Sequence, residues 1–315
     1  MALFRRKPKA VPVDLTAGDP RAAQLVDAVE SDDADGIRSV LGEATSVDER
    51  ERLTMLLTQL SGHPQPFESW VEREPDNPTA WLARAAHGIG YAWDARGAGY
   101  ADTVGKDGWT MFLERLRRAE GDLLRAAEYD RGDAVPWSMM LISGRGLEAP
   151  KEELLDRYEQ AQARHPWLLE AHLQLLQSLC QKWLGSDDEA LGFARAVARD
   201  APDGAAVLAV VPIAHIEIWL DMDRRDGADP DEYMRRPEVR EEIQEAARRS
   251  VFADGFADDL VTVPALNIFA VGLDLVGDGP GAAALVQRLG DRRAEFPWAY
   301  LLGDPGQRYA ELLAA

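Results

Sequence analysis

Apolar residues recur at helical spacing along most of this sequence, and no other feature constrains its fold as strongly. One run comprises Phe112, Leu116, Ala119, Leu123 and Ala127. Residues three or four positions apart lie on one face of an α-helix, whereas a half-buried strand alternates apolar and polar residues. β-Branched runs with that alternation are scarce. The spacing therefore predicts an all-α protein in which each helix buries one apolar face.

Four of the predicted helices end in similar short sequences, which finish at Pro75, Arg131, Pro166 and Pro202. The last two intervals between these positions are 35 and 36 residues, about the length of one helical hairpin in a repeat array. The first interval is 56 residues, and its surplus lies in residues 88–109, which contain six glycines and several aromatic residues. Because glycine disfavours helix, we expect an insertion that interrupts the repeats there.

Two tryptophans stand at equivalent places in the first two hairpins, since Trp81 and Trp137 each follow a hairpin end by six residues. Ala85 comes four positions after the first of them. In these positions the sequence resembles the tetratricopeptide repeats, whose first helix carries a tryptophan and then a small residue. Two later units carry other residues at the tryptophan position, His172 and Leu208. The resemblance covers about residues 65–222 and implies a TPR-like α-solenoid of degenerate helical hairpins with one aromatic, glycine-rich insertion.

Short segments elsewhere are similar to a second group of proteins. They read Trp-Asp-Ala-Arg-Gly at 93–97, Lys-Trp-Leu-Gly-Ser at 182–186, Phe-Ala-Arg at 193–195 and Pro-Trp-Ala-Tyr at 297–300. Together they resemble an uncharacterised bacterial family with TPR-like helices, described only as a domain of unknown function. This resemblance implies a bacterial helical protein and no particular reaction.

The sequence divides into three parts. Residues 1–18 begin with basic residues but lack the apolar core of a signal peptide, which predicts a flexible tail, or a short tether to a membrane surface. Residues 19–222 hold the predicted repeats, and residues 223–315 a helical region packed on them, with the boundary in the acidic stretch 221–231. In the last part the apolar spacing predicts helices near 237–251, 263–275, 279–293 and 305–314.

The chain carries 55 acidic and 35 basic side chains, a formal net charge of −20. Such a surface repels phosphate backbones and no basic stripe offsets it, so we expect no nucleic-acid partner. The longest apolar stretch, residues 205–220, contains Pro212, His215 and Glu217, which argues against a transmembrane segment. Cys180 is the single cysteine, which excludes a disulfide within the chain and favours a reducing, cytoplasmic compartment.

The sequence contains no motif for catalysis, a cofactor or a metal. Neither a Gly-x-Ser-x-Gly motif nor a phosphate-binding loop is present. No two histidines share the spacing of four residues that places two ligands on one helix face; the five are His63, His87, His165, His172 and His215. We therefore expect no catalytic residue, no metal site and no cofactor.

The 88–109 insertion holds the first candidate binding residues. Aromatic rings beside an arginine suit a peptide or planar ligand, through stacking and bidentate hydrogen bonds. In the alternative interpretation the rings fill the interior of the solenoid and the arginine pairs with a carboxylate. The residues concerned are Tyr91, Trp93, Arg96, Tyr100 and Trp109.

Further candidates lie on the predicted inner face of the repeats. His215 and Glu217 stand in an apolar helix, but positions two apart point about 200° from one another, so the two do not face each other. His215 is either a general base or a hydrogen-bonded core histidine, and Glu217 lines the inner face. Arg145 and Glu170 are the other charged candidates there, among mostly apolar positions.

These observations predict a non-catalytic interaction protein, a scaffold or adaptor that binds a peptide or partner helix in its groove. This prediction rests on analogy at the level of the fold. The alternative is an enzyme or small-molecule binder, with a pocket between the 88–109 insertion and the helix that bears His215.

Overall fold

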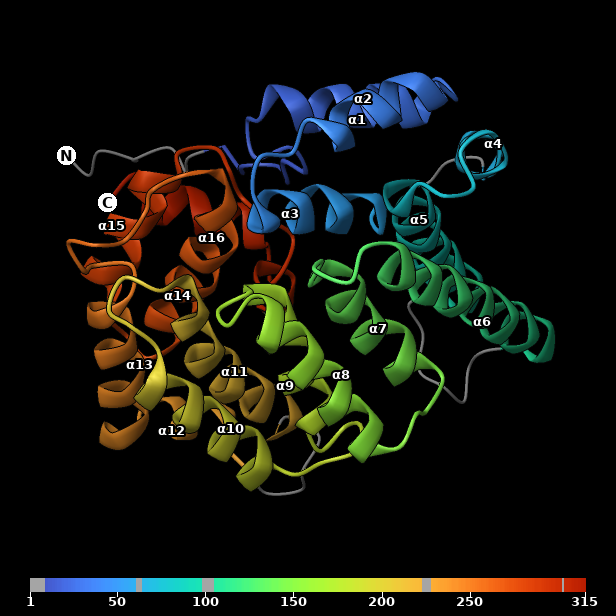
Figure 1. Ribbon diagram of the computed structural model, residues 1–315. Coiled ribbons are helices and arrows are strands. Elements are labelled where there is room, and N and C mark those ends of the chain that lie inside the picture. Colours follow the sequence, from blue (N-terminus) through green and yellow to red (C-terminus); the bar gives the residue numbers. More distant parts are fainter. Residues whose placement is uncertain (1–8, 61–63, 98–104, 223–227, 302) are drawn as a thin grey trace. The chain divides into compact units, whose positions relative to one another are not determined.

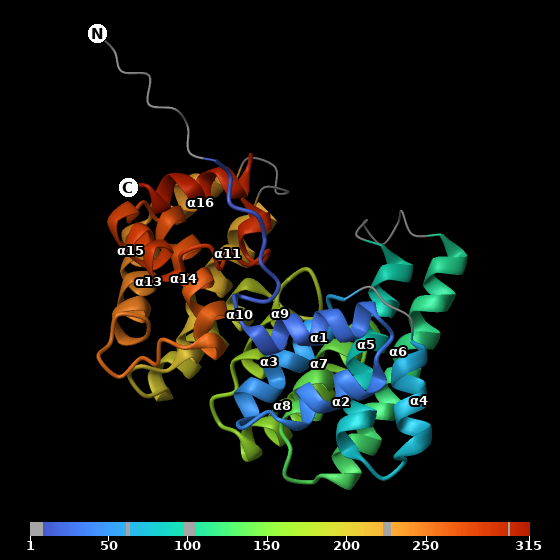
Figure 2. The same ribbon diagram turned by 90° about the horizontal axis from the view of Figure 1, so that it is seen from above.

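The computed structural model describes residues 9–60, 64–97, 105–222, 228–301 and 303–315. Over these residues the chain folds into sixteen α-helices with short 3-10 helices between some of them, and it forms no β-strand (Figures 1 and 2). The prediction of an all-α protein is confirmed. Over the same residues, no helix combines the length and the apolar character needed to cross a bilayer.

The helices form two compact units. We call Asp19–Ser178 the central unit, because it is continuous in sequence; the terminal unit joins the N-terminal residues up to Gly18 to Leu179–Ala315. The sequence placed the division in the acidic stretch 221–231, whereas the structure divides the chain near the end of α9. This difference arises because α10 packs on α11 within the terminal unit.

The helices of the central unit begin at capping residues that the sequence supplies. The side chains of Asp19, Asp33, Ser46 and Asn77 each accept a hydrogen bond from the first turn of a helix, which satisfies an amide that the helix itself cannot pair. The elements are α1 (Pro20–Glu30), α2 (Ala34–Gly42), α3 (Val47–Leu57), α4 (Gln65–Arg73), α5 (Pro78–Arg96), α6 (Lys106–Tyr129), α7 (Val135–Gly146), α8 (Lys151–Arg164) and α9 (Leu169–Leu179).

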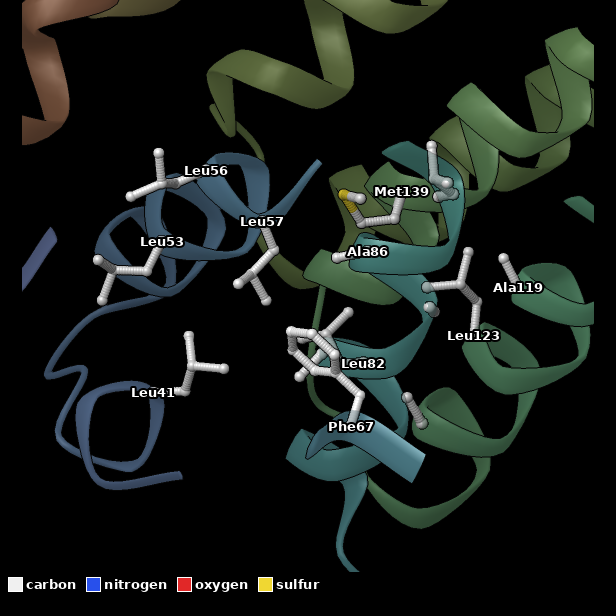
Figure 3. Close-up of a cluster of buried hydrophobic side chains, with 14 of the residues drawn as sticks. Leu41, Leu53, Leu56, Leu57, Phe67, Leu82, Ala86, Ala119, Leu123 and Met139 are labelled. Atoms are coloured by element: carbon white, nitrogen blue, oxygen red, sulfur yellow. The ribbon is translucent and has the colours of Figure 1, made fainter. Parts of the chain in front are cut away.

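Each of several helices in the central unit packs on its neighbour in sequence and on the helix two places further along. Helices α5, α6, α7 and α8 contact one another consecutively, while α3 contacts α5, α5 contacts α7, and α2 contacts α4. Figure 3 shows the resulting core, in which Leu53 and Leu57 of α3 lie near Leu82 and Ala86 of α5 and Met139 of α7. The core therefore runs continuously between successive helix pairs.

Within the predicted 88–109 insertion, the first two glycines do not end the helix that contains them. Helix α5 continues through Gly88 and Gly90 to Arg96, and α6 begins at Lys106, so most of the 88–109 insertion lengthens a helical hairpin (Figures 1 and 2). A Cβ at Gly90 would lie 2.8 Å from the carbonyl carbon of Thr58. The glycine therefore lets α5 approach the backbone just after α3, and this packing outweighs its low helix propensity.

Two nearly all-apolar helices form the centre of the terminal unit. Helix α11 packs on α10, α12, α13 and α14, and α14 packs on α13 and α15 as well. The sequence predicted α14 over its whole length and α13, α15 and α16 to within about four residues at their ends. The elements are α10 (Asp187–Asp200), α11 (Val210–Met222), α12 (Pro230–Met234), α13 (Pro237–Arg249), α14 (Val263–Leu275), α15 (Gly279–Leu289) and α16 (Pro305–Leu313).

The N-terminal segment belongs to the terminal unit. The Val11 amide donates to the Gly306 carbonyl over 3.1 Å, and the Asp14 amide donates to the Arg293 carbonyl over 3.0 Å. The Arg293 Nε in turn donates to the Val11 carbonyl over 2.8 Å. The sequence predicted a flexible tail over residues 1–18; residues 11 and 14 are instead tied to the C-terminal helices, and residues 1–8 lie outside the described residues.

Candidate functional site

At the end of the α5–α6 hairpin, the structure brings together three of the residues predicted to bind a ligand. The guanidinium carbon of Arg96 lies 5.4 Å from the ring centroids of both Trp93 and Trp109. The two indoles pack edge-on against Phe112, with centroid separations of 4.9 and 5.6 Å. The rings therefore pack against one another and against the arginine, as they do in a cluster with a structural role.

The other two aromatic candidates of the insertion are not part of this cluster. Tyr91 is exposed and its ring lies beneath the guanidinium of Arg115, 3.4 Å from the guanidinium carbon. The same arginine donates to the Tyr91 carbonyl over 2.5 Å. Tyr100 lies outside the described residues.

Arg145 joins a chain of hydrogen bonds inside the central unit. Its Nη1 donates to the side-chain oxygen of Gln174 over 2.7 Å, and the Gln174 amide donates to Glu170 over 2.5 Å. The Glu170 backbone amide donates to a carboxylate oxygen of Glu51 over 3.3 Å, and the Ser138 hydroxyl donates to the other oxygen over 2.7 Å. This chain, the inner polar network, links α3, α7 and α9.

Two carboxyl groups lie next to each other in the inner polar network, and of these Glu51 is buried and Glu170 half-buried. Burial raises the pKa of Glu51 well above its ordinary value, and the charge of Glu170 raises it further. Burial also raises the pKa of Glu170. The sequence indicated Glu170 but not Glu51, because charged residues surround Glu51 in α3 and no apolar pattern marks its position as buried.

The raised pKa of Glu51 predicts that the central unit loses stability as the pH rises. Above pH 4.5 the unfolded chain releases this proton while the folded chain keeps it, so the free energy of unfolding falls until the folded pKa is passed. Glu51→Gln is expected to remove part of that slope and to raise the unfolding free energy at pH 8 by about 1 kcal/mol or more. Urea unfolding between pH 4 and 8 measures this.

Glu74→Gln is the matched control for this measurement. Hydrogen bonds from Asn77, Arg38 and Trp70 lower the pKa of Glu74 to about 2. Its contribution is therefore present above pH 4.5 and lost as the pH falls toward 2, so its removal lowers the free energy of unfolding evenly above pH 4.5 and changes the slope of the profile only on the acid side. If Glu51→Gln left the slope between pH 4.5 and 8 unchanged, the assignment to Glu51 would be wrong.

In the terminal unit, the buried side chain of His215 belongs to a polar cluster that reaches the surface at Arg195. Its Nδ1 is 2.7 Å from the Tyr233 hydroxyl and its Nε2 is 3.2 Å from a Glu242 carboxylate oxygen. Arg195 donates to both oxygens of Glu242 over 2.7 and 2.9 Å. Burial alone would raise the pKa of Glu242, but the hydrogen bonds from His215 and Arg195 lower it to about 2. Both ring nitrogens of His215 therefore have partners, as in a hydrogen-bonded core histidine.

Glu217 lies in a different environment, at the wall of a small pocket. We call this the Glu217 pocket; its volume is about 170 Å³. The Glu217 carboxylate is only 3% exposed, and it lies 2.5 Å from the ammonium nitrogen of Lys182, whose side chain is 31% exposed. The pocket is lined by Cys180, Gln181, Lys182, Asp187, Ala190, Glu217, Ile218, Leu220, Asp221 and Tyr300.

Four separate segments of the terminal unit form the Glu217 pocket. Helix α11 contributes Glu217 and Asp221, which share a face because they are four residues apart. The turn after α9 contributes Lys182, the first turn of α10 contributes Asp187, and the 3-10 helix Trp298–Tyr300 contributes Tyr300. The pocket thus unites two of the short segments singled out in the sequence, 182–186 and 297–300.

The lining of the Glu217 pocket is acidic. Among the described residues it carries three carboxylates, of Asp187, Glu217 and Asp221, and one lysine. Trp183, Leu184 and Phe296 are exposed apolar side chains next to it in the chain or in space, since the first two follow Lys182 and the Phe296 ring lies 5.4 Å from the Tyr300 ring. Over the described residues, no group of three or more His, Cys, Asp or Glu side chains is placed to hold a metal ion.

The alternative pocket predicted from the sequence would join the 88–109 insertion to the helix of His215. The structure assigns the insertion to the central unit and His215 to the terminal unit. Within those units, Arg96 is stacked on two indoles and His215 is hydrogen-bonded on both sides. His215 is not among the residues that line the Glu217 pocket.

Compared with models of known protein families and with the curated proteins, the chain matches none. Its function is therefore inferred from the geometry of the Glu217 pocket and from the packing of its helices.

Proposed function

We propose that this chain is a non-catalytic, cytoplasmic interaction protein that binds a segment of another protein, and that one side chain of this partner enters the Glu217 pocket. The observation that carries the proposal is the size of the pocket. Sites for small-molecule substrates and cofactors generally enclose about 300–1,000 Å³, whereas this one encloses about 170 Å³. It has room for a side chain rather than for a whole substrate.

The surroundings of the pocket support a protein partner. Trp183, Leu184 and Phe296 expose more than a third of their surface beside it. Protein interfaces commonly concentrate their binding energy in a side chain that fills a pocket, with apolar and aromatic neighbours that exclude water around it. The Glu217 pocket and these three residues have that composition.

The packing of the helices supports a TPR-like arrangement within this proposal. Helices α6, α8 and α10 end at Tyr129, Arg164 and Asp200, intervals of 35 and 36 residues. Repeats of this length stack so that each hairpin buries its face against the next. The contacts of α3 with α5 and of α5 with α7 are of the kind that such stacking produces.

The enzyme alternative receives less support from the geometry. A general base must reach the proton that it abstracts. His215 is buried, both of its ring nitrogens have protein partners, and it lies outside the pocket lining.

Site-specific photocrosslinking tests the proposed function. Trp183 is replaced by p-benzoylphenylalanine in the full chain, and the protein is irradiated in its host cells. We expect a discrete crosslinked species that contains a second protein, identified by mass spectrometry. Leu124→p-benzoylphenylalanine is the control, because Leu124 is an exposed apolar residue of the central unit. Equal crosslinking at both positions, or none at Trp183, would reject the proposal.

A further inference from the structure

We infer that the amino-terminal segment of the chain controls the Glu217 pocket: docked on the terminal unit, it holds the pocket wall that Tyr300 forms, and its release lowers binding of the partner. We call residues 9–18 the strap. This inference rests on the proposed function and adds a means of regulation to it. Two observations carry it: the strap fastens the chain on both sides of Tyr300, and it does so without burying a side chain of its own.

The strap binds the terminal unit before and after Tyr300 in the sequence. Before it, the Arg293 carbonyl accepts from the Asp14 amide over 3.0 Å, and the Arg293 Nε donates to the Val11 carbonyl over 2.8 Å. After it, the Gly306 carbonyl accepts from the Val11 amide over 3.1 Å. The strap therefore joins two points that flank the pocket wall.

One further anchor holds the chain between these two points. The Asn267 oxygen accepts from the Ala294 amide over 3.1 Å and from the Trp298 indole over 2.8 Å. Tyr300 comes two residues after Trp298 and six residues before Gly306. Its position is thus set by the Asn267 anchor on one side and by the strap on the other, so loss of the strap frees the wall on the side of Gly306.

The strap can leave without unfolding the terminal unit. None of residues 9–18 is buried, and the side chains of Val13 and Leu15 are exposed. Its hydrogen bonds are replaced by bonds to water on release, and a segment held in this way opens at a much lower free energy than the whole unit does. The fraction of chains with the strap docked therefore sets the fraction with a held pocket wall.

The buried side chain of Arg293 favours the docked state. Arg293 is 8% exposed, and its Nε donates to the Val11 carbonyl of the strap. A buried charged donor that loses its acceptor loses stability. On release of the strap, Arg293 either keeps its place without this acceptor or turns toward water. Either response changes the start of the segment that leads to Tyr300.

Gly306→Ala releases the strap from the side of α16. A Cβ there would lie 2.7 Å from the Val11 carbonyl oxygen and 3.3 Å from the Ala10 Cβ, so the strap has to move away. Alanine is preferred over glycine within a helix, and α16 also packs on α15, so the helix is expected to remain. Gly279→Ala is the matched control, because a Cβ at that helix start would meet no described atom within 4 Å.

Val11→Pro releases the strap from its own side. Proline has no amide hydrogen to donate to the Gly306 carbonyl. Val11→Ala is the matched control, since it shortens the side chain and keeps the amide. Because the two releasing variants lie in different elements, a local effect at α16 alone would change only one of them.

Two properties are measured in the full chain. Hydrogen exchange of the peptide that contains residues 9–18, followed by mass spectrometry, reports release of the strap. The rate at which Cys180 reacts with a soluble aromatic disulfide reports the pocket wall, since this single, buried cysteine lines the pocket together with Tyr300. Gly306→Ala and Val11→Pro are each expected to raise both rates by about tenfold, and the two controls neither.

Crosslinking at position 183 then measures the effect on the partner. When Gly306→Ala is combined with p-benzoylphenylalanine at Trp183, we expect the yield of the crosslinked species to fall by about threefold or more. A strap that exchanges faster while Cys180 reacts at its natural rate overturns the inference. So does a strap that stays protected in both releasing variants, or an equal yield of crosslinked species with and without Gly306→Ala.

The failure of this inference is distinguishable from failure of the proposed function. Absence of crosslinking at position 183 in the natural chain rejects the protein partner. A partner that is crosslinked equally well in the natural and Gly306→Ala chains retains the interaction and rejects its control by the strap. Hydrogen exchange and the reaction of Cys180 need no partner, so they test the link between the strap and the pocket by themselves.

Discussion

Gly90→Ala is expected to lower the free energy of unfolding of the central unit by about 3 kcal/mol or more. The new Cβ would lie 2.8 Å from the carbonyl carbon of Thr58 and 3.1 Å from its Cα. These are backbone atoms, which cannot turn aside as a flexible side chain does, so α5 would have to move away from the end of α3. The shift would also loosen the packing of α3 on α5, which contribute Leu57 and Ala86 to the buried core shown in Figure 3.

Gly88→Ala is the matched control, because it lies one half-turn away in the same helix. A Cβ there would meet only the Ala119 methyl group, at 3.6 Å, which is an ordinary contact. Alanine is preferred over glycine within helices by about 0.8–1.0 kcal/mol, so this variant is expected to gain stability of that order. Hydrogen exchange of peptides from α3 and α5, measured by mass spectrometry, reports both effects. A Gly90→Ala variant as stable as the Gly88→Ala variant would disprove the close approach.

The second large effect is expected at Asn267 in the terminal unit. This side chain is fully buried in α14. Its amide nitrogen donates to the Val263 and Arg292 carbonyls over 3.0 and 3.2 Å, and its oxygen accepts from the Ala294 amide over 3.1 Å and from the Trp298 indole over 2.8 Å. One side chain therefore satisfies four backbone or indole groups of the unit.

Leucine has nearly the same shape as asparagine but can neither donate nor accept a hydrogen bond. Asn267→Leu is therefore expected to lower the free energy of unfolding of the terminal unit by about 3 kcal/mol or more. The cost is large because buried donors and acceptors left without a partner lose their full hydration. In chain labelled with ¹³Cβ-cysteine, the variant is also expected to shift the resonance of Cys180, since Cys180 and Tyr300 both line the Glu217 pocket and Tyr300 follows Trp298 by two residues. Urea unfolding and the resonance of the labelled cysteine measure the two effects.

Gln244→Leu is the control for the Asn267 variant. Its side-chain amide makes one hydrogen bond, to Asp278 over 2.7 Å, in a half-buried position. Removal of this single hydrogen bond is expected to lower the free energy of unfolding by about 1 kcal/mol or less and to leave the Cys180 resonance unchanged. Equal losses in the two variants would contradict the role assigned to Asn267.

The helices could be predicted from the sequence because the causes of helix formation are local. Apolar spacing and capping residues act within a few positions, which is why α14 is predicted residue for residue. The continuation of α5 through Gly88 and Gly90, inside the predicted 88–109 insertion, could not be predicted for the complementary reason. A glycine within a helix lowers the stability of that helix by about 1 kcal/mol relative to alanine. The packing of α5 against the end of α3 outweighs this loss, but no residue near Gly90 in the sequence indicates that Thr58 lies against it.

The candidate site could be predicted only in part, for the same physical reason. Helical periodicity marks Glu217 as a polar residue on an inner face, and the structure places it at the pocket. It cannot indicate that Lys182 and Tyr300, 118 residues apart in the sequence, meet beside it. The available signal lay in the short segments 182–186 and 297–300 around these two residues, because both resemble pieces of the same helical family.

The terminal unit consists of two segments that are far apart in the sequence, and this affects the order in which the chain folds during its synthesis. The hydrogen bond between Arg293 and Val11 spans 282 residues, so the amino-terminal segment leaves the ribosome long before its partners exist. The central unit can fold during that delay, and its folding shortens the stretch of flexible chain that must close. The completion of the Glu217 pocket, which needs Tyr300, then follows the folding of the central unit, and a chain that terminates before residue 300 would lack part of the pocket wall.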